Sequence, residues 1–331
     1  MRTPLIVELV VIARNSAVIL QKIYGDPGYL ALLDKYFDRR VYVDSSSDDG
    51  SVAVMQQAGF TCLLIESHGR MSAAASRAVA ASRSTADVIF FLDGDMIFDN
   101  VTELASHFQE FYSACENDSR ICGFTGRTVD VYPDDRTRER SPHRDSAGHS
   151  LSFGGFVAFE RASLLAAGNW NGNVVANEEL ELHARLRQVG KRVYYAHNLI
   201  VRHHTEVASP WWELAAAYLP LRPDRYGAFG MAMRASADAG SLPALFSLMP
   251  EPFVLMASLV VITTLWVVFG CKSSIFWFLM LMMMVSYAAW VASRRGLKFI
   301  FVVPSLLVSL PWGFLRYRQL SVVWRQLENN E

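Results

Sequence analysis

Two aspartates that directly follow an apolar run are the residues of this chain best suited to carry chemistry. Residues 88–92 read VIFFL, a pattern that predicts a strand buried on both faces, and Asp93-Gly94-Asp95 comes next. Open α/β sheets bind ligands at the carboxyl ends of their strands. Neighbouring carboxylates repel each other unless a cation or hydrogen-bond donors lie between them, and Mg²⁺ is usually held by one or two carboxylates together with substrate phosphates. The motif therefore indicates a metal–phosphate site, with a plain acidic turn as the alternative.

A second polar cluster follows another predicted strand, over residues 40–43. Asp44 ends this strand, and residues 45–51 read SSSDDGS, a turn that contains Asp49 and can cap the next helix. The elements expected around it are strands over residues 5–12 and 60–65 and helices over 52–58 and 71–83, the last with Arg77 in its middle. This alternation of strand and helix predicts a parallel, nucleotide-binding type of α/β sheet.

The next part of the chain adds glycines, glutamates and histidines to the candidate residues. Strands are predicted over residues 121–132, 151–159, 192–195 and 199–201, and a helix over 177–189. Gly154 and Gly155 permit close approach of the backbone, Glu178 and Glu179 begin the helix, and His203-His204 follow the last strand. Residues 133–150 are almost free of apolar side chains, and they form either an active-site loop or a solvated insertion.

Charged residues occur regularly up to Glu251 and then become rare. Runs without Asp, Glu, Lys or Arg fill the 20 residues between Glu251 and Lys272, the 21 between Lys272 and Arg294, and the 17 between Lys298 and Arg316. A helix needs about 20 apolar residues to cross the core of a bilayer. The first two runs meet this length and the third is marginal, so we expect a membrane protein with two or three spans.

The segments beside these runs also indicate a membrane. Residues 211–234 mix aromatic residues with arginines, among them Arg222 and Arg225, as amphipathic helices at a membrane interface do. Arg294 and Arg295 mark a cytoplasmic turn by the positive-inside rule. Residues 299–315 contain two prolines, and they form either a third span or a kinked re-entrant segment.

Three features of the sequence limit the expected compartment and partners of the protein. They are the amino terminus, the cysteines and the net charge. Residues 5–12 are apolar but short and contain Glu8, which does not match a signal peptide, so we expect the catalytic part to be cytoplasmic. The four cysteines lack metal-ligand spacing, as in proteins of a reducing compartment. The net charge of −1 gives no reason to propose nucleic acid binding.

Four landmarks give residues 4–205 a resemblance to the family 2 glycosyltransferases of the GT-A fold. Residues 43–51 are similar to the family's Val-Asp-x-Gly-Ser-x-Asp-Gly-Thr stretch, and Ser76-Arg77-Ala78 lies where the family has Ala-Arg-Asn. Residues 91–95 match its Asp-x-Asp strand, and residues 178–182 look like its acceptor-side Glu-Asp helix. The resemblance implies a Rossmann-like mixed sheet with flanking helices, here followed by a helical transmembrane region.

The resemblance also implies roles for single residues. It assigns the catalytic base to Glu179, with Glu178 as the fallback, and metal binding (Mg²⁺ or Mn²⁺) to Asp95 with Asp93 and with His203 or His204. It assigns nucleotide-sugar binding to Asp44, Asp49, Arg77 and Asp93, and the acceptor or lipid side to Gly154, Gly155, Arg222 and Arg225. Arg77 is expected to contact phosphate or to clamp Asp87 or Asp93.

These implications lead to one expected activity and two alternatives. We expect an inverting, metal-dependent transfer of a sugar from a nucleotide-diphosphate sugar to a polyprenyl-phosphate or lipid-linked saccharide, similar to bacterial exopolysaccharide assembly. Ala78 in place of the usual Asn leaves an inactive nucleotide-sugar-binding scaffold as an alternative, and the Asp-x-Asp strand leaves a phosphatase of the haloacid dehalogenase type. The Gln-x-x-Arg-Trp motif of processive synthases is absent from the sequence, which disfavours polymerisation.

The expected organisation has four parts and an inner-membrane location. Residues 1–208 form the catalytic domain, 209–250 the interface helices, 251–318 the transmembrane helices and 319–331 a cytoplasmic tail. The protein is expected to be a multi-pass protein of the cytoplasmic membrane.

Overall fold

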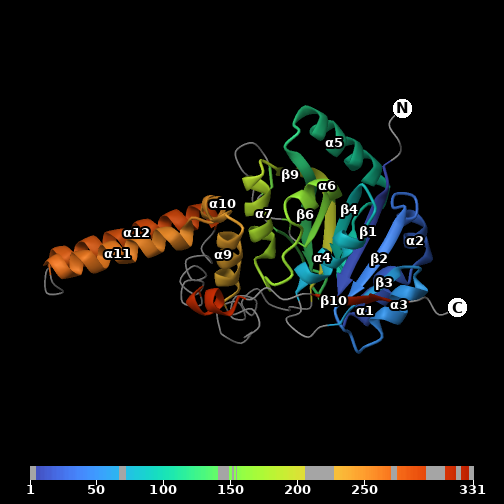
Figure 1. Cartoon of the computed structure of the whole chain (residues 1–331), viewed down its shortest axis with the longest axis horizontal. Helices are drawn as coiled ribbons and strands as arrows, with labels where there is room; N and C mark the ends of the chain where they lie inside the picture. Colours follow the sequence, from blue (N-terminus) through green and yellow to red (C-terminus); the bar gives the residue numbers. More distant parts are fainter. Residues whose placement is uncertain are drawn as a thin grey trace. The chain divides into compact units, whose positions relative to one another are not determined.

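The computed structural model describes residues 5–66, 72–140, 149–150, 153, 155–205, 227–269, 274–295, 310–317 and 322–327. The chain divides into two compact units, Met1–Ala208 with Arg318–Glu331, and Ser209–Tyr317. The first unit is built on a large β-sheet, whereas the second is helical (Figure 1).

Four parallel strands form one half of the sheet, in the spatial order β3-β2-β1-β4. They are β1 (Val7–Ala13), β2 (Arg39–Asp44), β3 (Thr61–Glu66) and β4 (Val88–Asp93). β4 is buried on both faces, because Phe90 packs in one hydrophobic cluster and Phe91 in the other. Ile12 pairs with Asp93 and Ala13 pairs with Asp44, so the two aspartates lie at the same carboxyl-terminal edge.

The other half of the sheet is mixed, and it begins where β8 pairs antiparallel with β4. Its strands are β5 (Met96–Phe98), β6 (Ile121–Val131), β7 (Thr137–Glu139), β8 (Phe156–Glu160) and β9 (Arg192–His204). β10 (Val323–Gln326) pairs antiparallel with the free edge of β3. The described residues thus form a ten-stranded sheet in the order β10-β3-β2-β1-β4-β8-β6-β9-β5. The tenth strand, β7, pairs with β6.

Helices cover both faces of this sheet and supply its two hydrophobic clusters. One cluster contains residues of α1 (Ala17–Tyr24), α2 (Pro27–Leu33), α3 (Ser51–Gln57) and α5 (Leu104–Asn117), which follows a short 3₁₀ turn at Val101–Glu103. The other contains residues of α4 (Ala73–Arg83), α6 (Arg161–Ala166) and α7 (Glu178–Gln188). The alanines of α4 bring that helix close to the sheet, and the Ser72 hydroxyl caps it by accepting a hydrogen bond from Ala75 N at 3.0 Å.

Several local predictions differ from the structure. The residue at the N-cap of α3 is Gly50, with φ of +87°, and no serine side chain caps that helix. The strands predicted over 192–195 and 199–201 are a single strand, β9, whose pairing with β6 contains irregularities. The strand predicted over 151–159 begins only at Phe156, and the polar segment after residue 133 contains β7, which forms a hairpin with β6.

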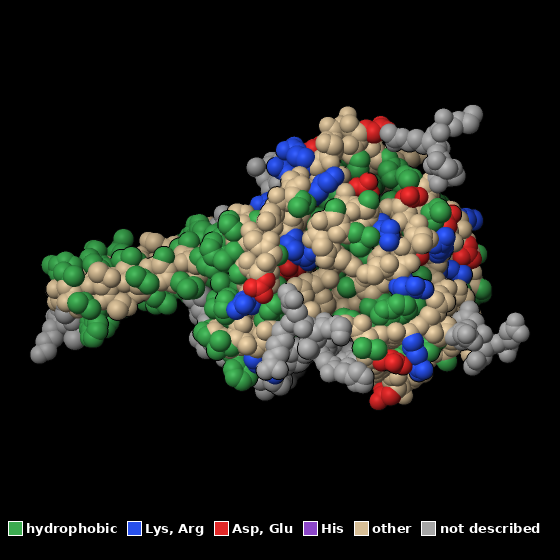
Figure 2. Space-filling view, viewed as in Figure 1, with side chains coloured by type: hydrophobic (Ala, Val, Ile, Leu, Met, Phe, Trp, Pro, Cys, Tyr) green, Lys and Arg blue, Asp and Glu red, His purple; other side chains and the backbone are tan. Residues whose placement is uncertain are grey.

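The second unit contains four named helices among its described residues: α9 (Ala228–Asp238), α10 (Leu242–Leu248), α11 (Glu251–Phe269) and α12 (Ser274–Arg295). Two of these, α11 and α12 up to Ser293, are long and apolar enough to cross a membrane, with mean hydropathies of 2.3 and 2.0. Their side chains are largely exposed, and hydrophobic groups dominate their surface in Figure 2. The Tyr287 hydroxyl of α12 donates a hydrogen bond to Glu251 O of α11 at 3.1 Å.

Some predicted features lie outside the described residues. These are the proposed interface segment up to residue 226, which contains Arg222 and Arg225, and residues 299–309 of the proposed third membrane segment, residues 299–315. The described remainder of that segment, residues 310–315, is helical. Gly154 also lies outside them.

Candidate active site

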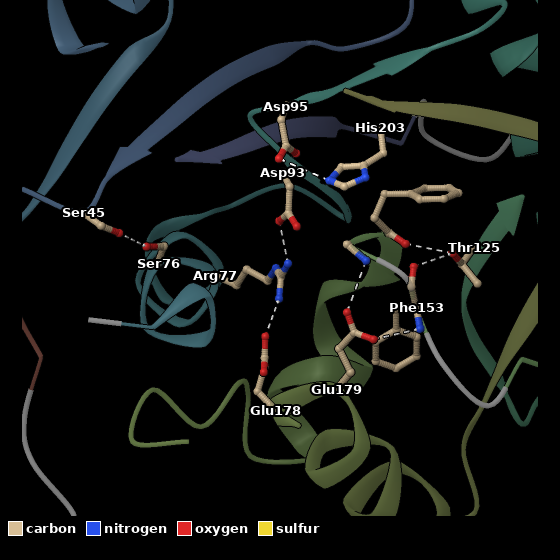
Figure 3. A network of polar contacts seen from close by, with 12 residues as sticks. Ser45, Ser76, Arg77, Asp93, Asp95, Thr125, Phe153, Glu178, Glu179 and His203 are labelled. Carbon is tan, nitrogen blue, oxygen red and sulfur yellow. Dashed lines mark hydrogen bonds and ion pairs between the residues drawn. The ribbon is translucent and has the colours of Figure 1, made fainter. Parts of the chain in front are cut away.

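Arg77 of α4 is the buried cation at the centre of the predicted site. Its side chain is 3% exposed, and Nη2 lies 2.7 Å from Asp93 Oδ1 while Nη1 lies 3.4 Å from Glu178 Oε1 (Figure 3). The guanidinium also lies 4.8 Å from the centre of the Trp170 ring. A buried charge requires such partners, because desolvation alone is strongly unfavourable. Arg77 therefore joins β4 to the start of α7 and clamps Asp93; Asp87, the other candidate, instead accepts a hydrogen bond from Ile6 N.

Burial and Arg77 have opposite effects on the pKa values of the two carboxylates that Arg77 joins, Asp93 and Glu178. Burial raises the pKa of Asp93, an effect that Arg77 opposes and the neighbouring Asp95 reinforces. Burial likewise raises the pKa of Glu178, again opposed by Arg77. The pKa of Arg77 itself is raised, since burial lowers it but the charges of Asp93 and Glu178 outweigh that effect. The ionised forms of both carboxylates thus depend on Arg77.

Asp95 faces one of the two predicted histidines. His203 Nε2 lies 3.3 Å from Asp95 Oδ2, and the pairing of β5 with β9 fixes this approach because Met96 lies opposite His203. Neighbouring residues of a strand point to opposite faces. His203 is therefore the histidine whose ring lies beside the acidic pair of Asp93 and Asp95, while the backbone N–H of His204 donates to Asp95 O at 2.8 Å.

The surroundings of the two histidines shift their pKa values in opposite directions. Burial of the His203 ring lowers its pKa, but hydrogen bonds to Asp130 and Asp95 outweigh burial and raise the pKa to about 9. Burial and the nearby Lys22 lower the pKa of His204.

The acidic pair offers a partial ligand set for a divalent cation. The described residues contain no group of three or more His, Cys, Asp or Glu side chains arranged to hold a metal. However, Asp95 Oδ1 is buried and has no hydrogen-bond partner among the residues that the structure describes. Buried carboxylate oxygens normally have partners, so this atom fits a cation. Asp95 and His203 can supply two ligands, and a substrate diphosphate and water can supply the others.

Glu179 is held on the opposite side of the site by backbone groups. Phe153 N donates to Glu179 Oε2 and Gly155 N donates to Glu179 Oε1, both at 3.2 Å (Figure 3). The Thr125 hydroxyl fixes the same segment, since it lies 3.1 Å from Phe153 O and 2.8 Å from Phe156 O. The carboxylate of Glu179 therefore has a defined orientation.

Gly155 connects Glu179 to the acidic pair. Its carbonyl accepts a hydrogen bond from Asp93 N at 3.2 Å, and its φ of +93° is a conformation that favours glycine. A Cβ at this position would lie 2.7 Å from Asp93 Oδ2 and 2.5 Å from Met96 Cε. The predicted close backbone approach at this glycine is confirmed.

Asp44 and Asp49 hold the turn after β2. Asp44 is fully buried, and its carboxylate accepts hydrogen bonds from the Tyr42 hydroxyl at 2.8 Å and from Ser47 N at 2.7 Å. Asp49 accepts from Ala17 N at 2.8 Å and from the Ser51 hydroxyl at 2.6 Å. Both lie at the predicted edge of the sheet, but a nucleotide reaches Asp44 only if its present hydrogen bonds are exchanged.

A cavity of about 350 Å³ lies between the ends of β1, β2 and β4 and the start of α4. Asp93, Gly94 and Asp95 line one side, and the Ser45 and Ser76 hydroxyls, 2.9 Å apart, line another. The remaining polar lining residues were not predicted: they are Arg14, Ser16 and Ser72. Arg14 directly follows β1, so its position at the carboxyl end of a parallel strand was the signal that could have identified it.

The comparisons with known proteins concern the fold and the family. The structure is similar to that of the mannosyltransferase PcManGT from Pyrobaculum calidifontis in complex with GDP-Man and Mn2+, with a TM-score of 0.50 and 15% identity, covering 94% of this chain and 87% of that one. It is also similar to S. aureus TarS 1-349, with a TM-score of 0.50 and 11% identity, covering 92% of this chain and 90% of that one. A search of curated proteins gave no match.

The mixed sheet with its acidic pair at the end of β4 is thus a GT-A fold. Residues 19–164 match the model of the family described as glycosyl transferase family 2. This match covers less than half of the chain, and together with the fold it identifies the protein as a glycosyltransferase. The phosphatase alternative suggested by the Asp-x-Asp strand is therefore wrong.

Proposed function

We propose that this glycosyltransferase is inverting and metal-dependent, and that it moves a sugar from a nucleoside diphosphate sugar to an acceptor held at a membrane. The observation that carries the proposal is the buried Asp95 Oδ1, which lacks a hydrogen-bond partner among the described residues and lies beside the cavity at the end of β4. A divalent cation satisfies this atom and attracts a diphosphate to the same place. The mannosyltransferase of similar fold is in complex with GDP-Man and Mn2+, which supports this choice of ligands.

On the donor side, the cavity accommodates the nucleoside diphosphate. Asp95 and His203 would hold the cation, Mg²⁺ or Mn²⁺. When bound, this cation would offset the charge that develops on the departing diphosphate. Arg77 keeps Asp93 ionised and oriented, and the Ser45 and Ser76 hydroxyls offer hydrogen bonds to the nucleoside. Asp44 and Asp49 support this side of the cavity through the turn that they hold.

On the acceptor side, Glu179 is the catalytic base. An acceptor hydroxyl attacks the anomeric carbon, its proton passes to Glu179, and the bond from that carbon to the diphosphate oxygen breaks. Attack from the face opposite the leaving group inverts the anomeric centre. The two backbone N–H groups that bind Glu179 orient it for this step, whereas Glu178 is engaged by Arg77.

The acceptor belongs to a membrane in this proposal, as a polyprenyl phosphate or a lipid-linked saccharide. The support is α11 and α12, two exposed apolar helices of spanning length. The same helices and the apolar runs of the sequence support the proposal of a multi-pass protein of the cytoplasmic membrane with a cytoplasmic catalytic domain. Gly154, Gly155, Arg222 and Arg225 are proposed to lie on this acceptor side.

Release of nucleoside diphosphate tests the proposal. The full-length protein in detergent is supplied with a panel of nucleotide sugars, Mn²⁺ or Mg²⁺, and membrane lipid extract, with and without a chelator. We expect one donor to be consumed only with metal, and to be consumed faster with lipid. Activity that persists in chelator contradicts metal dependence, and donor binding without turnover identifies an inactive scaffold.

A further inference from the structure

Asp130 is a buried carboxylate on β6 on which three cationic or potentially cationic side chains converge. Its side chain is 2% exposed. Asp130 Oδ1 lies 2.8 Å from His203 Nδ1 and 2.8 Å from Arg140 Nε, while Oδ2 lies 3.1 Å from Arg138 Nη2. β6 and β9 place Asp130 directly opposite His203. No sequence motif predicted a role for this aspartate.

The contact with Asp130 determines which nitrogen of His203 keeps its hydrogen when the protonated ring loses one proton to become a neutral ligand. An ionised carboxylate only accepts hydrogen bonds, so the Asp130 contact requires a hydrogen on Nδ1. In the neutral ring, Nε2 then has a free lone pair, and Nε2 is the atom that faces Asp95. Histidines that bind metals commonly donate their second N–H to a carboxylate in this way.

Arg140 competes for the same nitrogen. Arg140 Nη2 lies 2.7 Å from His203 Nδ1, and an arginine can only donate, so this contact requires that Nδ1 carry no hydrogen. A neutral His203 would then carry its hydrogen on Nε2 and donate it to Asp95, which blocks a cation. The two contacts therefore favour opposite tautomers, and only the contact with Asp130 leaves Nε2 free.

We propose that Asp130 is a positioning residue that selects the Nδ1-protonated tautomer of His203 and thereby makes Nε2 available to the cation beside Asp95. Arg138 and Arg140 bind the carboxylate of Asp130 and keep it in place from the β7 hairpin and the residue that follows it. The orientation of His203 thus depends on the hairpin as well as on its own strand. The inference rests on the proposed function, because it assigns His203 to the metal.

The test is the affinity of the full-length protein for Mn²⁺ alone, measured in detergent by electron paramagnetic resonance of free Mn²⁺. We expect Asp130→Asn to weaken binding by about 10–100-fold, the usual effect of removing a partner that orients a metal ligand. Glu139→Gln makes the same chemical change in the same hairpin, at a carboxylate that pairs with Arg127 away from His203, and should leave the affinity unchanged.

A double-mutant cycle separates positioning from general damage to the fold. In a His203→Ala background, Asp130→Asn should have no further effect on Mn²⁺ affinity. A further loss in that background, or an unchanged affinity of the single variant, overturns the inference. No Mn²⁺ binding by the wild type instead contradicts the proposed function.

A measurement on the wild-type protein keeps the inference testable if Asp130→Asn does not fold. Nitrogen-15 chemical shifts of His203, assigned by comparison with His203→Ala, report the tautomer in the Mg²⁺-loaded protein. We expect hydrogen on Nδ1, and hydrogen on Nε2 alone would contradict the role of Asp130.

Discussion

Arg77 and Asp93 form an ion pair of 2.7 Å although 16 positions separate them in the chain, and this pair joins α4 to the carboxyl end of β4. Without Arg77, Asp93 and Glu178 would lose the buried guanidinium that both contact.

Replacement of Arg77 by alanine should therefore lower stability as well as activity. Removal of one partner of a buried pair costs about 3–5 kcal/mol, and the partial exposure of Asp93 favours the lower end of this range. Urea unfolding followed by fluorescence measures the change. Arg83→Gln, in the same helix, loses a contact with the Trp324 ring and should cost about 1 kcal/mol or less. Equal losses in the two variants would contradict the central role of Arg77.

Gly155→Ala should reduce activity by at least about 10-fold, because its Cβ would displace Asp93 or Met96. Gly190→Ala is a matched control, since Gly190 also has a positive φ of +73° but nothing lies within 4 Å of its added Cβ. Both variants should lose about 1 kcal/mol of stability from backbone strain. Donor turnover and thermal unfolding are measured on both variants, and only Gly155→Ala should lose turnover. Normal turnover of Gly155→Ala would contradict the close packing at this glycine.

Glu179→Gln should lower the turnover with a saccharide hydroxyl acceptor by about 10²–10⁴-fold, because a neutral amide cannot take up the proton. With a polyprenyl phosphate acceptor the loss should be much smaller, because the attacking phosphate oxygen carries no proton. Turnover of Glu179→Gln at saturating donor, measured with each acceptor, shows which of the two acceptor classes requires the base. Glu178→Gln is the comparison, and a larger loss in that variant would move the base assignment to Glu178.

Glu8, buried in β1, predicts a dependence of stability on pH. Burial raises the pKa of Glu8, an effect that Ser84, Arg39 and Arg161 only partly oppose. A raised pKa in the folded state means that stability is highest below the unfolded pKa of about 4.3 and falls as pH rises through the folded pKa. Glu8→Gln should therefore be more stable than the wild type at pH 7, by on the order of 1 kcal/mol, and should lose this advantage near pH 4.

Glu139 provides a control of opposite sign for this effect. A hydrogen bond from Arg127 lowers the pKa of Glu139, so Glu139→Gln should be less stable than the wild type at pH 7 and equal to it at low pH. Urea unfolding across this pH range checks both variants. A Glu8→Gln variant less stable than the wild type at pH 7 would contradict the penalty for burying this carboxylate.

The parallel half of the sheet, with Asp44 and Asp93 at its carboxyl-terminal edge, was predictable from the sequence. β4 is a continuous apolar run up to Asp93, and β1 is apolar apart from Glu8. Asp44 and Asp93 directly end β2 and β4. These are local signals, and parallel strands carry their carboxyl ends to one edge. The presence of Arg77 and Glu179 near that edge followed from the family resemblance.

The rest of the site depends on pairings between distant parts of the chain. The choice between His203 and His204 follows from the register of β5 with β9, and the role of Asp130 from the register of β6 with β9. β10 was predicted as part of a tail because Val323–Gln326 is too short to show a periodic pattern, and it becomes a strand by pairing with β3. The residues near each strand do not reveal with which distant strand it pairs or in which register.

The most direct test of the central claim is a crystal or cryo-EM structure of the full-length protein with Mn²⁺ and a nucleoside diphosphate. The account predicts Mn²⁺ bound to Asp95 Oδ1 and His203 Nε2, with the diphosphate in the cavity beside Asp93 and the Ser45–Ser76 pair. A diphosphate bound elsewhere, with Asp95 free of metal, would contradict it.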